Sequence, residues 1–187
     1  MKEISKLGII LLIITSIAAA GLGFVNGITN GPIEEQMRLA DVEAMKQVLP
    51  DADDFEQLDI QSPDEYIIIT EIFKGTAGGN EKGYTLKTIP GGYGGPVEVM
   101  IGISQDGEIT GVNIGNHSET PGLGAKASEE GFMGQYKEKN SDMEIKVIKS
   151  GAPEEDEIEA ISGATITSDA VTNGVNEAIK YYNKELK

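Results

Sequence analysis

The stretch PVEVMIGISQDGEITGVNIG, residues 96–115, decides the fold. Its first nine and last eight residues are rich in the β-branched and apolar side chains that strands favour. Between these runs stand Gln105, Asp106 and Gly107, and an Asp-Gly step in that position favours a tight hairpin turn. The stretch therefore predicts two antiparallel strands.

Two further strands are expected upstream of this hairpin. The runs YIIITEIF (residues 66–73) and GYTLKTI (residues 83–89) have strand composition, and the turn-rich segment GTAGGN (residues 75–80) separates them. Before them, DADDFEQLD (residues 51–59) has too many acids and too few apolar positions for a core element, so we expect a solvated loop there. Together the strands predict an antiparallel sheet.

Downstream of the hairpin the chain changes character. The segment AKASEEGFMGQYKEK (residues 125–139) predicts a helix that Gly131 and Gly134 weaken. Residues 144–148 are short and β-branched enough to predict one more strand.

The last helix is the clearest element, and it begins at Ser168, with Ser168 or Asp169 as the expected cap. Its apolar residues recur on one helical face: Val171, Val175, Ala178, Ile179, Tyr182 and Leu186. Tyr181 and Tyr182 are expected to pack this helix against the domain rather than to offer a stacking platform. Strands first and helices at the margins predict a single α+β domain.

An uncharged run of 27 residues, 7–33, precedes the domain. Roughly 20 apolar residues suffice to cross a bilayer as a helix, so the run predicts a transmembrane anchor. A cleaved signal peptide is the alternative, because Lys2 and Lys6 resemble its charged region and residues 18–20 are alanines. The run continues well past those alanines, which favours a retained helix.

The distribution of basic residues predicts the orientation of the anchor. Lys2 and Lys6 flank its amino end, whereas Arg38, behind two glutamates, is the first basic residue on the other side. This bias places the N-terminus in the cytoplasm and the rest of the chain outside the cell membrane. A helix between Pro32 and Pro50 is expected to lead into the domain. The predicted organisation is a cytoplasmic tip and anchor (1–31), a connecting helix and acidic linker (32–59), and an extracytoplasmic domain (60–187).

Composition removes several classes of function. The chain has no cysteine, which excludes a disulfide framework, a cysteine-ligated iron–sulfur cluster and a thiol nucleophile. His117 is its only histidine, which argues against multi-histidine metal sites. The net charge of −16 argues against nucleic acid as a ligand. A metal-free role without nucleic acid remains.

The segment EAISGATITSD, residues 159–169, carries the chemistry. It leads into the last helix, where the first N–H groups lack partners and lie at the positive end of the helix dipole, so a phosphate is stabilised there. Gly163 and Ala164 allow a bulky anion close to the backbone, and the hydroxyls belong to Ser162, Thr165, Thr167 and Ser168. On these grounds alone, a plain N-terminal cap with a tight turn is the better explanation of the segment.

A family resemblance favours the phosphate site. The run ISGATIT, residues 161–167, resembles the flavinylation motif S/T-G-A-T-x-T of the FMN-binding domain found in the G-type component of Rnf complexes and the C-type component of sodium-translocating NADH:quinone reductases. Upstream, HSETPGLGAK (residues 117–126), by itself an ordinary Pro-Gly loop, resembles the E-T-P-G-L-G segment of the same family. Both motifs stand in family order after a single anchor.

The resemblance implies an FMN joined covalently by a phosphoester bond to Thr167, the final threonine of the motif. It further implies that these residues form the cofactor site: Ser162, Gly163, Ala164, Thr165, Glu119, Thr120, Pro121, Gly122, Leu123 and Gly124. His117, Lys126 and the GGYGG loop (residues 91–95) are weaker candidates, equally well explained as surface positions. No histidine, cysteine or lysine lies near Thr167 in sequence to activate its hydroxyl, so the family's separate flavin transferase is expected to make the bond. The family often has aspartate where this chain has Glu159, and the retained negative charge leads us to expect that the transferase still accepts it.

The function implied is that of the G-type component of an Rnf complex, a translocase that couples ferredoxin:NAD oxidoreduction to ion translocation. Such a component carries electrons and completes no catalytic cycle alone. Its expected partners are the other subunits of the complex, including a second flavinylated membrane subunit and iron–sulfur subunits. The rivals are the C-type component of a sodium-translocating quinone reductase, a stand-alone extracytoplasmic flavoprotein, and a non-redox scaffold module in which the Ser/Thr turn is only a helix cap.

Overall fold

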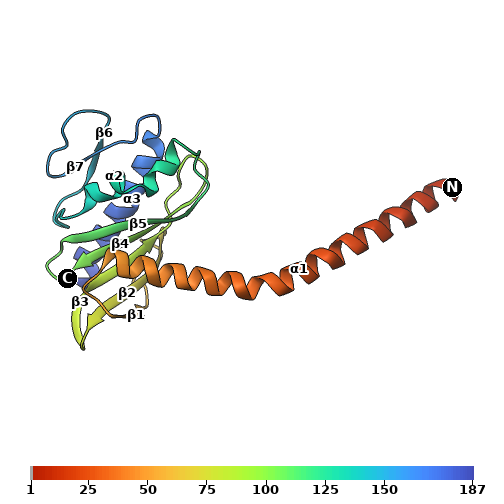
Figure 1. The fold of residues 1–187 in the computed structure, drawn as a ribbon, viewed down its shortest axis with the longest axis horizontal. Helices are drawn as coiled ribbons and strands as arrows, with labels where there is room; N and C mark the ends of the chain where they lie inside the picture. The colour runs from red at the N-terminus through yellow and green to blue at the C-terminus, as the bar shows by residue number, and fades with distance from the viewer. Residues whose placement is uncertain (1) are drawn as a thin grey trace. The chain divides into compact units, whose positions relative to one another are not determined.

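A computed structural model describes residues 2–187, which divide into two units at the boundary between Val42 and Glu43 (Figure 1). Most of the first unit is helix α1, Lys2–Val48, whose C-terminal end belongs to the second. Among the described residues α1 is the one helix long and apolar enough to cross a membrane. The predicted separate helix after Pro32 is wrong, because α1 continues through this residue. A proline removes one backbone hydrogen bond. A long helix tolerates this loss because the residues around the proline still form their backbone hydrogen bonds.

The second unit is built on one antiparallel sheet (Figure 1). Its strands, paired in chain order, are β1 (Asp54–Leu58), β2 (Ile69–Ala77), β3 (Asn80–Thr88), β4 (Val97–Ser104) and β5 (Ile109–His117). The predicted hairpin is β4–β5, with Gly102 opposite Gly111. The predicted loop at 51–59 is wrong for β1, which pairs with β2 as an edge strand. An edge strand accepts this acidic sequence because its outer side and one face remain in water.

Helix α3, Thr165–Tyr181, covers one face of the sheet and builds the core. Val171 and Val175 of the helix, and Val99 and Ile101 of β4, are fully buried. The predicted apolar face of this helix is therefore confirmed, and a π-helical turn at Tyr182–Leu186 continues it. Tyr182 is buried as well, which confirms its packing role.

The end of α1 lies against the opposite face of the sheet. Because side chains alternate along a strand, Gly102 faces away from Ile101 and its core. A Cβ atom on Gly102 would overlap the backbone carbonyl of Val48, so the absence of a side chain there lets the helix end approach the sheet. Thr110 donates a hydrogen bond to the same carbonyl oxygen. The last turn of α1 is thus part of the domain.

The segment between β5 and α3 is the most irregular. The predicted helix at 125–139 is three short pieces: a 3₁₀ turn (Gly124–Ser128), α2 (Glu130–Met133) and a second 3₁₀ turn (Gly134–Tyr136). The predicted strand at 144–148 is β6 (Lys146–Ile148), paired in parallel with β7 (Glu157–Glu159). A long apolar N-terminal helix followed by an antiparallel sheet with flanking helices confirms the predicted α+β class.

Candidate functional site

A pocket of about 550 Å³ opens at the N-terminal end of α3. Three segments that are distant in sequence line it: the β3–β4 loop, the loop after β5, and the start of α3. The lining residues are Tyr93, Glu119, Thr120, Leu123, Gly124, Gly163, Ala164, Thr165, Ile166 and Thr167. The pocket is within the usual size range for small-molecule sites.

The first turn of α3 leaves its backbone donors available. The helix begins at Thr165 after Ala164, and no side chain caps it. The prediction that Ser168 or Asp169 caps the start is wrong, because the Ser168 hydroxyl points back, accepts a hydrogen bond from the N–H of Ile161 and donates one to the carbonyl of Ala164. Three helical residues therefore precede Ser168, and their N–H groups suit an anion.

The hydroxyl of Thr167 donates a 2.7 Å hydrogen bond to Oε2 of Glu119. Both side chains are buried, with 1% of Thr167 and 6% of Glu119 exposed. The other carboxylate oxygen of Glu119 accepts a 2.9 Å hydrogen bond from the backbone N–H of Gly94. Glu119 thus connects the β3–β4 loop to the start of α3 within the lining of the pocket.

These contacts keep Glu119 ionised. Burial by itself raises the pKa of the carboxyl group, because it disfavours the charged form. Hydrogen bonds from Thr167 and from the backbones of Gly94 and Tyr93, together with the charge of His117, outweigh burial, and the pKa of Glu119 lies below its ordinary value. At neutral pH the Thr167 hydroxyl therefore faces a carboxylate.

Gly124 makes this contact possible. A Cβ atom at this position would overlap Oε2 of Glu119 and lie 2.7 Å from Oγ1 of Thr167. Only a residue without a side chain leaves room for both groups.

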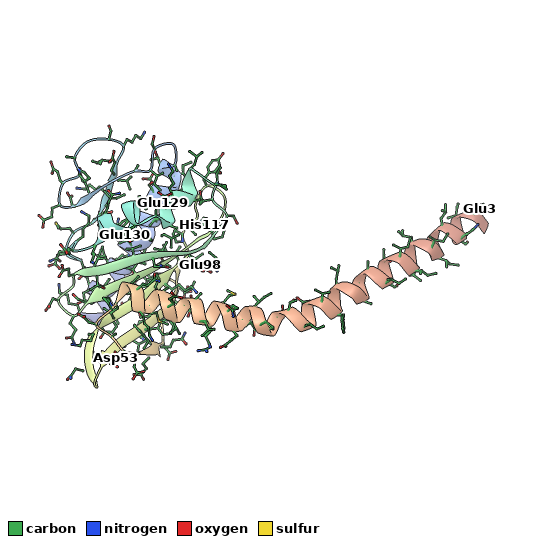
Figure 2. The ribbon with its side chains drawn as sticks, viewed as in Figure 1. Glu3, Asp53, Glu98, His117, Glu129 and Glu130 are labelled. Atoms are coloured by element: carbon green, nitrogen blue, oxygen red, sulfur yellow. The ribbon has the colours of Figure 1, made fainter. Side chains whose placement is uncertain are left out.

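His117, labelled in Figure 2, supports the loop from the end of β5. Its Nδ1 accepts a 3.2 Å hydrogen bond from the N–H of Glu119, and its Nε2 lies 3.2 Å from the hydroxyl of Ser128. His117 therefore positions Glu119 without lining the pocket. Lys126 is exposed and is not among the lining residues.

The structure brings most of the sequence-predicted site residues to one pocket. Ser162, Pro121 and Gly122 are not among the lining residues, although each adjoins one that is. Ile166 was missed, because the motif pattern leaves its position open. Tyr93 lines the pocket from the GGYGG loop, and no sequence pattern distinguished it from an ordinary turn tyrosine.

Comparison with known proteins identifies the domain that contains the pocket. Residues 92–180 match the model of the FMN-binding domain. The chain is 42% identical over 200 residues to the G component of the Na(+)-translocating ferredoxin:NAD(+) oxidoreductase complex of Acetobacterium woodii, covering the whole of this chain and 95% of that protein. It is 34% identical to the G component of the ion-translocating oxidoreductase complex of Methanosarcina acetivorans, with 98% and 97% covered.

The chain belongs to the family of G components of Rnf-type ion-translocating oxidoreductase complexes. The predicted family is therefore confirmed.

Solved structures show the same fold in a related protein. The C component of the Na(+)-translocating NADH-quinone reductase from Parabacteroides distasonis is 26% identical, with a TM-score of 0.51 over 62% of this chain and 63% of that one. The corresponding protein from Shewanella oneidensis is 21% identical, with a TM-score of 0.54 over 61% and 59%. This chain thus spans less than two thirds of either solved protein, and the second likeness concerns the fold alone.

Proposed function

We propose that this chain is the G component of an Rnf complex and carries FMN bound through its phosphate to the hydroxyl of Thr167. The complex would couple electron transfer between ferredoxin and NAD to ion translocation, as the name of the Acetobacterium woodii relative states for that protein. FMN, when bound, supplies the redox chemistry. The chain itself binds the cofactor, orients it and completes no catalytic cycle alone.

The observation that carries this proposal is the position of Thr167. Its hydroxyl lies at the third residue of α3, beside the free N–H groups of the first turn and within the lining of the pocket. A phosphate esterified there meets the N–H groups and the positive end of the helix dipole. The covalent bond also makes sense for a domain outside the cell membrane, where a dissociable cofactor is easily lost.

The pocket wall suits the rest of the cofactor. Tyr93, Leu123 and Ile166 are 72%, 44% and 55% exposed, and all three belong to the lining. Large apolar side chains exposed at a pocket mark a surface that an apolar ligand covers. They are the residues we expect beside the flavin ring, with Gly163, Ala164 and Thr165 around the attachment.

In-gel flavin fluorescence of the denatured protein tests the attachment. The full chain is produced with a flavin transferase, beside Thr167→Ala and the matched control Thr165→Ala. We expect a fluorescent band in the wild type and in the control and none in Thr167→Ala. A Thr167→Ala band that still fluoresces after denaturation would overturn the assignment, and three dark bands would favour the scaffold alternative.

The membrane orientation is a separate proposal: N-terminus in the cytoplasm and residues 43–187 outside. Because the chain has no cysteine, Lys137→Cys places a single thiol at an exposed position of the domain. A membrane-impermeant maleimide added to intact cells should label it. Labelling only after lysis would reverse the orientation.

The partners are proposed to be the remaining Rnf subunits, including a second flavinylated membrane subunit and iron–sulfur subunits. Co-purification of the tagged full chain from its membrane identifies them. Recovery of the components of a quinone reductase would favour the rival assignment as the C component of that enzyme.

A further inference from the structure

We propose that Glu119 is the base that takes the hydroxyl proton from Thr167 while this threonine is esterified. The inference rests on the proposed attachment of FMN at Thr167 and adds a catalytic residue from this chain to that reaction. The decisive geometry is the 2.7 Å hydrogen bond from Oγ1 of Thr167 to Oε2 of Glu119.

No histidine, cysteine or lysine lies near Thr167 in sequence, and folding brings the carboxylate of Glu119 to its hydroxyl. A threonine hydroxyl is a weak nucleophile until a base removes its proton. A base must lie within about 2.6–3.2 Å of the proton donor, and Glu119 meets this requirement although it is 48 residues away along the chain.

The same contact selects one hydroxyl among several. The hydroxyl of Ser168 donates a hydrogen bond to the backbone carbonyl of Ala164. Among residues 162–168, all of which the structure describes, Thr167 is the residue whose hydroxyl donates to a carboxylate in the hydrogen bonds found. Selection by Glu119 explains why the ester forms at this threonine although Ser162 and Thr165 stand close by.

The surroundings hold the carboxylate in the form that a base needs. The N–H of Gly94 fixes one oxygen of Glu119, and the other faces Thr167. Each element packed against Glu119 contributes a group: the charge of His117 from β5, the backbone N–H groups of Gly94 and Tyr93 from the β3–β4 loop, and the Thr167 hydroxyl from α3. An ionised carboxylate in a fixed position is a suitable proton acceptor.

The reaction balances with an anhydride donor. Free FMN offers no good leaving group, so the donor class is a flavin dinucleotide, which contains a pyrophosphate. Oγ1 of Thr167 forms a bond to the phosphorus on the flavin side, the bond from that phosphorus to the bridging oxygen breaks, and a nucleoside monophosphate leaves. The hydroxyl proton passes to Glu119 and then to solvent, and nothing is oxidised or reduced.

The test measures the rate of flavin transfer to the cofactor-free full chain in detergent, with purified flavin transferase and flavin adenine dinucleotide. Intact mass reports the product, and thermal unfolding of each cofactor-free variant reports the fold. Glu119→Gln keeps the shape and an oxygen that accepts from Thr167 but cannot take a proton. We expect the kcat of transfer to fall roughly 10²-fold or more, with an unchanged KM for the acceptor chain.

A second variant separates a base from a structural residue. Glu119→Ala should be equally slow, and formate should restore part of its rate whereas formamide should not, because only formate is a base. Transfer to Glu119→Gln at the wild-type rate, or faster transfer to Glu119→Ala, would overturn the proposal. In either case, the assignment of Thr167 as the attachment site would still hold if the wild type is labelled and Thr167→Ala is not. Absence of wild-type labelling would instead contradict the proposed function.

Discussion

Oε2 of Glu119 and Oγ1 of Thr167 are joined by a 2.7 Å hydrogen bond between two buried side chains that stand 48 residues apart in sequence. This contact is made by two side chains of the protein itself. It fixes the loop after β5 against the start of α3, so the pocket is held together by the same pair of residues that we propose to react. Stability and flavin transfer should therefore both respond to changes at this pair.

The stability of the cofactor-free domain should depend on pH through Glu119. Its pKa is lowered in the folded state relative to the ordinary value of 4.5, so it contributes stability that is fully present above about pH 4.5 and is lost as the pH falls through the lower folded value. Glu119→Gln has no such contribution to lose. We expect the difference in unfolding free energy between wild type and Glu119→Gln to shrink on acidification.

Urea unfolding at pH 7 and at about pH 4 measures this difference. All six tyrosines of the chain lie in residues 43–187 and the chain has no tryptophan, so the near-ultraviolet circular dichroism of tyrosine follows the domain and not the helix before it. Other carboxylates with lowered pKa values, such as Glu65, Glu81 and Asp156, are common to both proteins and cancel. A constant difference across this pH range would contradict the assignment.

Gly124→Ala should separate Glu119 from Thr167. The added methyl group would overlap the carboxylate and crowd the hydroxyl, and such overpacking typically costs about 1–3 kcal/mol. We expect a lower melting temperature and slower flavin transfer. Gly131→Ala is the control, because nothing lies within 4 Å of the added atom and alanine favours α2. If both variants behave like the wild type, the close approach at Gly124 does not matter.

Much of this architecture follows from the sequence, and the exceptions have physical reasons. The β4–β5 hairpin and the apolar face of α3 are local patterns, fixed by an Asp-Gly turn and by helical spacing. The edge strand β1 was missed because it is stabilised by pairing with β2, and its acidic sequence has no local pattern that predicts this pairing. The start of α3 was placed three residues late, because Ser168 has the composition of a cap while its hydroxyl bonds inward.

The site shows the same division. The motif predicts Thr167 and its neighbours, and the E-T-P-G-L-G segment predicts Glu119 as part of the site. The hydrogen bond that Glu119 accepts from the Thr167 hydroxyl is a tertiary contact. It forms only when the loop after β5 folds over the N-terminal end of α3, so the sequence pattern does not predict it. The contribution of Tyr93 depends likewise on the hydrogen bond from Gly94 to Glu119, which places the GGYGG loop at the pocket.

Gly102→Val should detach the end of α1 from the sheet. Valine suits a strand by composition, yet here its side chain would overlap the backbone of Val48, which cannot be accommodated by a rotamer change. We expect a loss of about 1–3 kcal/mol or more in the unfolding free energy, measured by urea unfolding. Lys82→Val, on the exposed surface of β3, is the control and should be near neutral. Equal stability of the two variants would mean that the end of α1 does not pack against the sheet at Gly102.

The boundary of the domain gives the last prediction. A chain that begins at Glu43 keeps Met45, Val48 and Leu49, whose side chains are 4%, 1% and 1% exposed, whereas a chain that begins at Asp51 lacks all three. Burial of one such side chain contributes about 1.5–3 kcal/mol, so the shorter chain should lose several kcal/mol, a large share of the stability of an ordinary domain. We expect residues 43–187 to fold cooperatively without the preceding part of α1 and residues 51–187 to melt far lower or to aggregate. Melting temperatures by circular dichroism distinguish the two, and equal values would place the start of the domain after α1 rather than within it.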